Sequence, residues 1–74
     1  MTKLELLNAL IDDMGKELVK AEFNVDFYAQ EEKRPMTMGQ AQAKEGKDVW
    51  TERVKTVEAQ IRLYEKYRKR TYGV

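Results

Sequence analysis

The fold of this protein is decided by residues 4–28, which read LELLNALIDDMGKELVKAEFNVDFY. Apolar side chains recur in this stretch at alternating steps of three and four residues: Leu4, Leu7, Ile11, Met14, Leu18, Ala21, Val25 and Tyr28. Such a 4-3 repeat places all of these side chains on one stripe of an α-helix, as in a coiled coil. The sequence therefore predicts one long helix with a continuous packing seam.

The two ends of this first helix are also marked. Thr2 followed by Glu5 is a capping-box pattern, in which each side chain bonds the backbone N–H of the other residue. The helix should end near Glu32 or Lys33, because Pro35 disfavours helical geometry at the residue before it and has no N–H to donate.

A second helix is predicted by a second seam, at Trp50, Val54, Val57, Ile61 and Tyr64. It should end near Tyr72–Gly73, with Gly73 as the C-terminal cap. Its start has two candidates. Thr37 with Gln40 repeats the capping-box pattern, and Asp48 is an alternative N-cap. Starting at Asp48 would leave an unusually long connection of about fifteen residues. We therefore favour Thr37, with a kink or frayed segment near Gly46, although the state of residues 38–48 stays open.

These elements predict an all-α fold, in which residues 1–74 form a single domain. Two long helices joined by a short turn at Arg34–Met36 make an antiparallel hairpin. Folding about Pro35 places residue i roughly opposite residue 70−i. Ala43 and Lys47, at the upstream end of the second seam, are poor core residues. Residues 1–37 carry a net charge of −3 and residues 38–74 a net charge of +4, which favours this pairing of acidic and basic helices.

Further apolar side chains fall outside both seams. The candidate interface residues are Leu6, Leu10, Val19, Phe23, Phe27, Leu63 and Tyr67. This is more apolar surface than a small monomer usually exposes. We expect the hairpin to pair with itself as a four-helix bundle or larger oligomer, or the Phe23/Phe27 stripe to bind another protein.

The end of the second helix suggests an alternative function. Basic residues alternate there with tyrosines, and the candidate contacts to an anion or nucleic acid are Arg62, Lys66, Arg68, Lys69, Arg70 and Tyr72. Cations bind phosphates and aromatic rings stack on bases. Against this, cations near a helix C-terminus also stabilise the helix dipole, and the net charge of the whole chain is only +1.

Catalytic chemistry has few candidates in this chain, which contains no histidine, cysteine or serine. Glu22 and Asp26 share a helix face, but an acidic pair of this kind is typical of a solvated surface. The glycines are scattered rather than grouped in a phosphate-binding loop. We therefore expect no catalytic residue, metal site or cofactor, and no enzyme activity. The chain also lacks a long apolar run and a secretory-signal pattern, so we expect no membrane partner and a cytoplasmic location.

In size and composition the chain resembles the small accessory proteins of bacteriophages and mobile elements. This resemblance implies action by binding a host enzyme or by sequestering a signal molecule. The expected function is that of a non-catalytic protein-interaction module, acting as an inhibitor, adaptor or sequestering protein.

Overall fold

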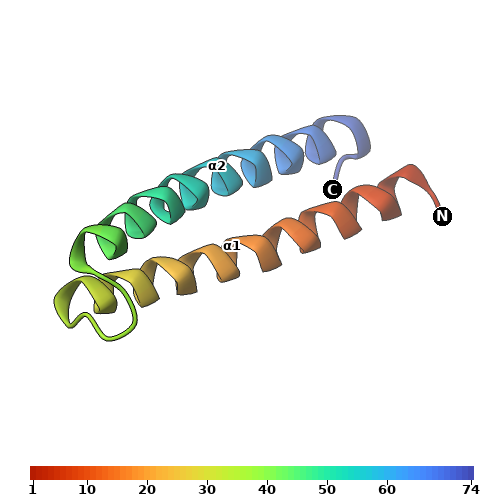
Figure 1. The fold of residues 1–74 in the computed structure, drawn as a ribbon. Helices are drawn as coiled ribbons and strands as arrows, with labels where there is room; N and C mark the ends of the chain where they lie inside the picture. Colours follow the sequence, from red (N-terminus) through yellow and green to blue (C-terminus); the bar gives the residue numbers. More distant parts are fainter.

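The computed structural model describes residues 1–74 as two antiparallel helices packed side by side (Figure 1). Helix α1 spans Lys3–Lys33 and helix α2 spans Gln40–Tyr72, and residues 34–39 connect them. Both chain termini lie at the end opposite the connection, which we call the open end. The molecule measures 48 × 19 × 12 Å, so it is only about one helix thick in its smallest dimension. The predicted all-α hairpin is confirmed.

The helix ends follow the sequence signals at three of the four positions. Both capping-box hydrogen bonds form at the start of α1, each 3.1 Å long, between Thr2 and Glu5. Helix α1 ends at Lys33, two residues before Pro35. Helix α2 ends at Tyr72 and is capped by Gly73, whose φ of 72° lies in the left-handed region that glycine adopts without strain.

The predicted seams form the contact between the helices. All eight seam residues of α1 and all five of α2 are buried or half-buried. The most buried of them are Ala21, which is fully covered, Val57, which is 2% exposed, and Leu7, which is 9% exposed. The core is therefore a single layer of side chains between two helices.

The start of α2 differs from the prediction. The helix begins at Gln40 with Gly39 as its N-cap, and no side chain caps it. Both members of the predicted capping box bond the end of α1 instead. The Thr37 hydroxyl donates to Glu31 over 3.0 Å, and the Gln40 side-chain amide donates to the carbonyl oxygen of Glu32 over 3.2 Å. The alternative start at Asp48 is also wrong, because residues 40–48 are helical.

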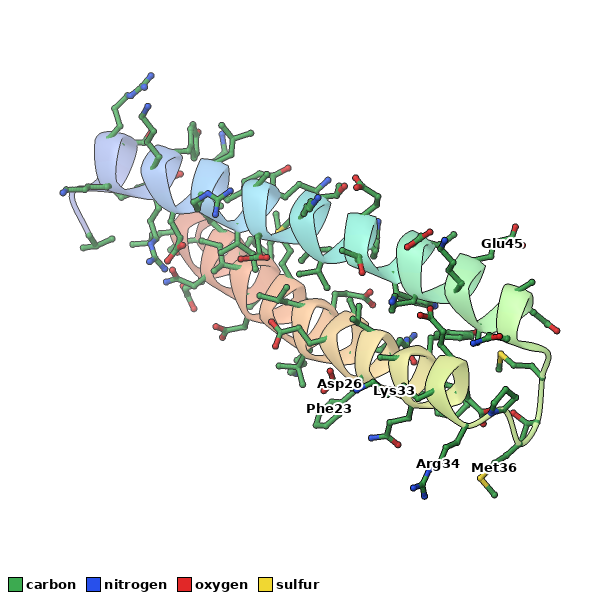
Figure 2. The ribbon with its side chains drawn as sticks, turned by 90° about the vertical axis from the view of Figure 1, so that its left-hand side faces the viewer. Phe23, Asp26, Lys33, Arg34, Met36 and Glu45 are labelled. Carbon is green, nitrogen blue, oxygen red and sulfur yellow. The ribbon has the colours of Figure 1, made fainter.

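The connection is organised around the carboxylate of Glu31, which is only 7% exposed. One of its oxygens accepts hydrogen bonds from the backbone N–H groups of Met36, at 2.8 Å, and Thr37, at 3.3 Å. Together with the Thr37 hydroxyl, these donors stabilise the charged carboxylate, and the backbone hydrogen bond from Met36 is the main cause of its lowered pKa. Arg34 and Met36 project from this connection (Figure 2).

Replacing Glu31 should loosen the connection. We expect Glu31→Gln to lower the melting temperature by roughly 3–8 °C, because the amide cannot reproduce three bonds to a charged acceptor. Since the folded-state pKa lies below the ordinary value of 4.5, the contribution of Glu31 is present at neutral pH and is lost as the pH falls below about 4.5. Thermal melts of Glu31→Gln should accordingly show a weaker loss of stability in acid than the wild type. Glu45→Gln, on an exposed site of α2, is the matched control, and an equal effect of both changes would contradict this role.

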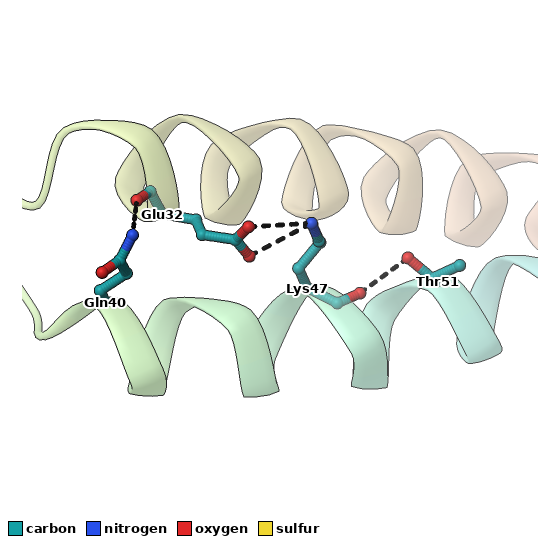
Figure 3. A network of polar contacts seen from close by, with 4 residues as sticks. All are labelled: Glu32, Gln40, Lys47 and Thr51. Atoms are coloured by element: carbon teal, nitrogen blue, oxygen red, sulfur yellow. Dashed lines mark hydrogen bonds and ion pairs between the residues drawn. The ribbon is translucent and has the colours of Figure 1, made fainter.

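The first turns of α2 pack more closely on α1 than predicted. Ala43 is fully buried, so its assignment as a poor core residue is wrong. No kink or fray occurs at Gly46, where α2 continues and the ring of Tyr28 lies against the backbone. The side chain of Lys47 forms an ion pair with Glu32 across the helices, with its amino group 3.2 Å from the nearer carboxylate oxygen (Figure 3). Small side chains and one ion pair thus replace large apolar residues at this end of the seam.

The alignment of the two helices agrees only partly with the predicted pairing of residue i with residue 70−i. Glu17 faces Arg53, as folding about Pro35 requires, and their charged groups are 3.9 Å apart. The ring of Tyr28, however, packs on Gly46, four residues beyond position 42, and Asn8 accepts a hydrogen bond from Arg68, six residues beyond position 62. The physical reason is the length of the connection, which takes six residues instead of three and moves the centre of the turn past Pro35.

Candidate interaction surface

Large apolar side chains outside the seam are exposed on both helices. Within α1 and α2 they are Leu6, Leu10, Val19, Phe23, Phe27, Val49, Leu63 and Tyr67. This set contains all seven candidate interface residues of the sequence analysis. Their exposure follows from the helical repeat, which turns most positions outside the seam towards solvent.

One part of this surface is an apolar stripe on α1, formed by Val19, Phe23 and Phe27. These side chains are 52%, 70% and 46% exposed, respectively. Phe23 lies on the side of α1 that faces away from α2 (Figure 2). The ring of Phe27 packs edge-on against Tyr28, with 5.3 Å between ring centroids. Phe27 is therefore partly anchored to the hairpin, whereas Phe23 is the most exposed residue of the stripe.

A second part lies near the open end. The Arg68 guanidinium donates to the side-chain oxygen of Asn8 over 2.9 Å, which fixes the height of α1 relative to α2 there. This bond brings the turn of α1 that carries Leu6 and Leu10 level with the turn of α2 that carries Leu63 and Tyr67. All four of these side chains are at least 41% exposed. The structure thus brings together apolar residues that are more than fifty positions apart in the sequence.

A groove of about 380 Å³ beside the connection was not predicted. Phe27 and Met36 form its apolar part, and its polar lining comes from Gln30, Glu31, Lys33 and Arg34. Met36 is 87% exposed, which a methionine directly after a turn proline could have indicated. The shape of the groove, in contrast, depends on how Glu31 holds the connection, and no local sequence motif encodes this.

The basic segment of α2 is divided between two environments. The side chains of Arg62, Lys66, Lys69 and Arg70 are exposed and have no carboxylate within ion-pair distance. Arg68 instead turns towards α1 and bonds Asn8. Tyr72 is half-buried and packs edge-on against Tyr67, with 6.4 Å between the ring centroids. The candidate anion-binding residues therefore do not form one continuous surface.

The acidic residues form no metal-binding group. No three carboxylate side chains lie close enough together to hold a metal ion. Glu22 and Asp26 line a shallow hollow of about 240 Å³ with Val25, Thr51 and Val54. Neither helix contains a stretch that is both long enough and apolar enough to cross a lipid bilayer.

Comparison with known proteins identified no relative: no protein-family model, curated protein or solved structure matches this chain. The exposed apolar surface of the hairpin is therefore the feature on which a function can be argued.

Proposed function

We propose that this protein is a non-catalytic protein-interaction module, which acts as an inhibitor, adaptor or sequestering protein by binding a partner through its exposed apolar side chains. The observation that carries the proposal is the apolar surface left uncovered on both helices. Large apolar side chains that are 41–70% exposed favour contact with another protein, because covering them removes apolar area from water.

The surface area of the molecule supports the same proposal. The chain exposes 5796 Å² for a mass of 8.7 kDa. Compact monomers of this mass expose only about 4,700 Å². The surplus of roughly 1,000 Å² exceeds the area of about 800 Å² that one partner buries in a standard protein–protein interface.

Binding of nucleic acid is supported less well by the geometry. Arg68, at the centre of the basic segment, is engaged with Asn8, and Tyr72 is half-buried against Tyr67. The net charge of +1 also provides little long-range attraction for a polyanion.

Phe23 is the residue on which to test partner binding. It is the most exposed of the apolar side chains within the helices and contributes nothing to the seam, so Phe23→Ala should leave the hairpin folded. We expect this variant to lose about tenfold or more in affinity for the partner, because exposed aromatic residues often dominate binding energy. The measurement is affinity capture from an extract of the source cells, followed by titration of the captured protein.

The matched control is Lys16→Ala, which changes an exposed residue one heptad before Phe23 on the same face of α1. Its circular dichroism spectrum and that of Phe23→Ala should both match the wild type. If the wild type and Phe23→Ala captured the same proteins with equal affinity, the proposal that the apolar stripe binds the partner would be overturned.

A further inference from the structure

The two flanks of the hairpin, on either side of the seam, are chemically different. With Leu4 and Val54 assigned to heptad position a, the seam occupies positions a and d of both helices. The ion pair between Glu17 and Arg53 then joins position g of α1 to position g of α2. Positions g and c of both helices therefore share one flank, and positions e and b share the other.

Apolar residues concentrate on the g/c flank. Of the eight exposed large apolar residues within the helices, six occupy these positions: Leu6, Leu10, Phe27, Val49, Leu63 and Tyr67. We call this side the apolar flank. The e/b side, which we call the charged flank, carries one exposed large apolar residue, Val19. The difference in charge lies on α2, which has two charged residues on the apolar flank against seven on the charged flank: Lys44, Asp48, Lys55, Glu58, Arg62, Glu65 and Lys69.

A helix that packs against two neighbours at once, as in a four-helix bundle, needs a second apolar stripe beside its a/d seam. The apolar flank supplies apolar residues on both helices, near the open end and near the connection. The surplus surface of the molecule, roughly 1,000 Å², exceeds the area of about 800 Å² that one partner buries in a standard interface. We infer that a second copy of this chain covers the apolar flank, so that two hairpins form a four-helix bundle. This inference rests on the proposed function and names one partner of that surface.

Charge selects the orientation of the two copies. A two-fold axis parallel to the helices places α1 of one copy on α2 of the other, with both connections at the same end. A two-fold axis across the helices places α1 on α1 and α2 on α2. Because the half of the chain with α1 has a net charge of −3 and the half with α2 a net charge of +4, the first arrangement is the favourable one.

The apolar residues are placed at heights that fit this arrangement. Near the open end, Leu6 and Leu10 of one copy meet Leu63 and Tyr67 of the other, because the bond between Asn8 and Arg68 fixes these turns at one level. The polar middle of the flank brings Glu17 of each copy towards the basic α2 of its partner.

Near the connection, a hollow of about 360 Å³ lies beside Gly46, and Tyr28, Val49 and Trp50 line it together with Gln42 and Glu45. Phe27 is next to Tyr28 in the sequence and half-exposed, and therefore lies at the height of this hollow. In the proposed dimer, Phe27 of one copy enters the hollow at Gly46 of the other.

The first test is the mass in solution, measured by sedimentation equilibrium over a range of protein concentrations. We expect the wild type to reach twice 8.7 kDa. Leu63→Glu should raise the dimer dissociation constant about 100-fold or more, because each dimer would bury two unpaired carboxylates. Ala41→Glu places the same charge on the charged flank, at an exposed position of the same helix, and should leave the dissociation constant unchanged. A wild type that stays at 8.7 kDa, or equal effects of the two variants, would overturn the proposal.

The second test remains informative even if Leu63→Glu fails to fold. It measures the relative orientation of the two copies in the dimer. The natural chain has no cysteine, so a single introduced cysteine has no native thiol with which to form a competing disulfide. Under mild oxidation, a mixture of Phe27→Cys and Val49→Cys chains should form a disulfide-linked heterodimer, which requires Cα atoms within about 7 Å. A mixture of Phe27→Cys and Leu10→Cys should not. The opposite pattern would overturn the orientation, whereas unchanged partner capture by Phe23→Ala would contradict only the proposed function.

Discussion

Truncation of Leu7 to alanine is expected to lower the free energy of unfolding by about 2–4 kcal/mol, the usual cost of removing a buried leucine side chain. Leu7 is 9% exposed and lies in the seam, and only four other residues of the chain are as well buried. A chain of this length has a total stability of roughly 4–11 kcal/mol, so the change should remove a large part of it. Urea denaturation followed by circular dichroism measures the effect.

The neighbouring residue provides the control. Leu6 has the same chemistry and the same helix, but it is 53% exposed. At concentrations low enough to keep the hairpin monomeric, Leu6→Ala should change the free energy of unfolding by less than about 0.5 kcal/mol. Similar losses in the free energy of unfolding for Leu7→Ala and Leu6→Ala would contradict the assignment of Leu7, and not Leu6, to the seam.

Two glycine-to-alanine changes are expected to act in opposite directions. A Cβ atom added at Gly15 meets no atom within 4 Å, so Gly15→Ala should stabilise α1 by about 1 kcal/mol through helix propensity. A Cβ atom at Gly46 would lie 2.5 Å from the nearest ring carbon of Tyr28. Displacing this packed ring should cost about 2–3 kcal/mol, which is more than the gain in propensity. Urea denaturation should therefore separate the two variants by roughly 2 kcal/mol or more.

The cause of the second effect can be checked with a double variant. In a Tyr28→Ala background the ring is absent, and Gly46→Ala should then stabilise the helix as Gly15→Ala does. If Gly46→Ala also stabilised the otherwise unchanged chain, the ring of Tyr28 would not be held against α2.

The parts of the fold that local patterns encode could be predicted from the sequence. The 4-3 repeat identifies the seam because helical periodicity alone decides which side chains share a face, and every seam residue proved at least half-buried. The capping box at Thr2 and the left-handed Gly73 depend only on neighbouring residues, and both form as predicted. The positions of the exposed apolar residues follow from the same periodicity.

The parts that depend on competition between distant groups could not be predicted in this way. Thr37 and Gln40 form a valid capping pattern, but Glu31 and Glu32 take up both side chains once Pro35 has turned the chain. Gly46 suggests a weak point in a helix, yet the ring of Tyr28 fills the space that it leaves. The groove beside the connection involves Met36 together with Arg34 and the end of α1, so no single element predicts it.

The position of the two termini at one end of the hairpin has a practical consequence for engineering. Because α1 begins and α2 finishes side by side, the whole hairpin can be grafted into a surface loop of a host protein with little distortion of the host. The grafted hairpin would project from the host surface over its length of 48 Å, with the groove beside Met36 at its far end. Whatever binds that groove would then be presented at a fixed distance from the host.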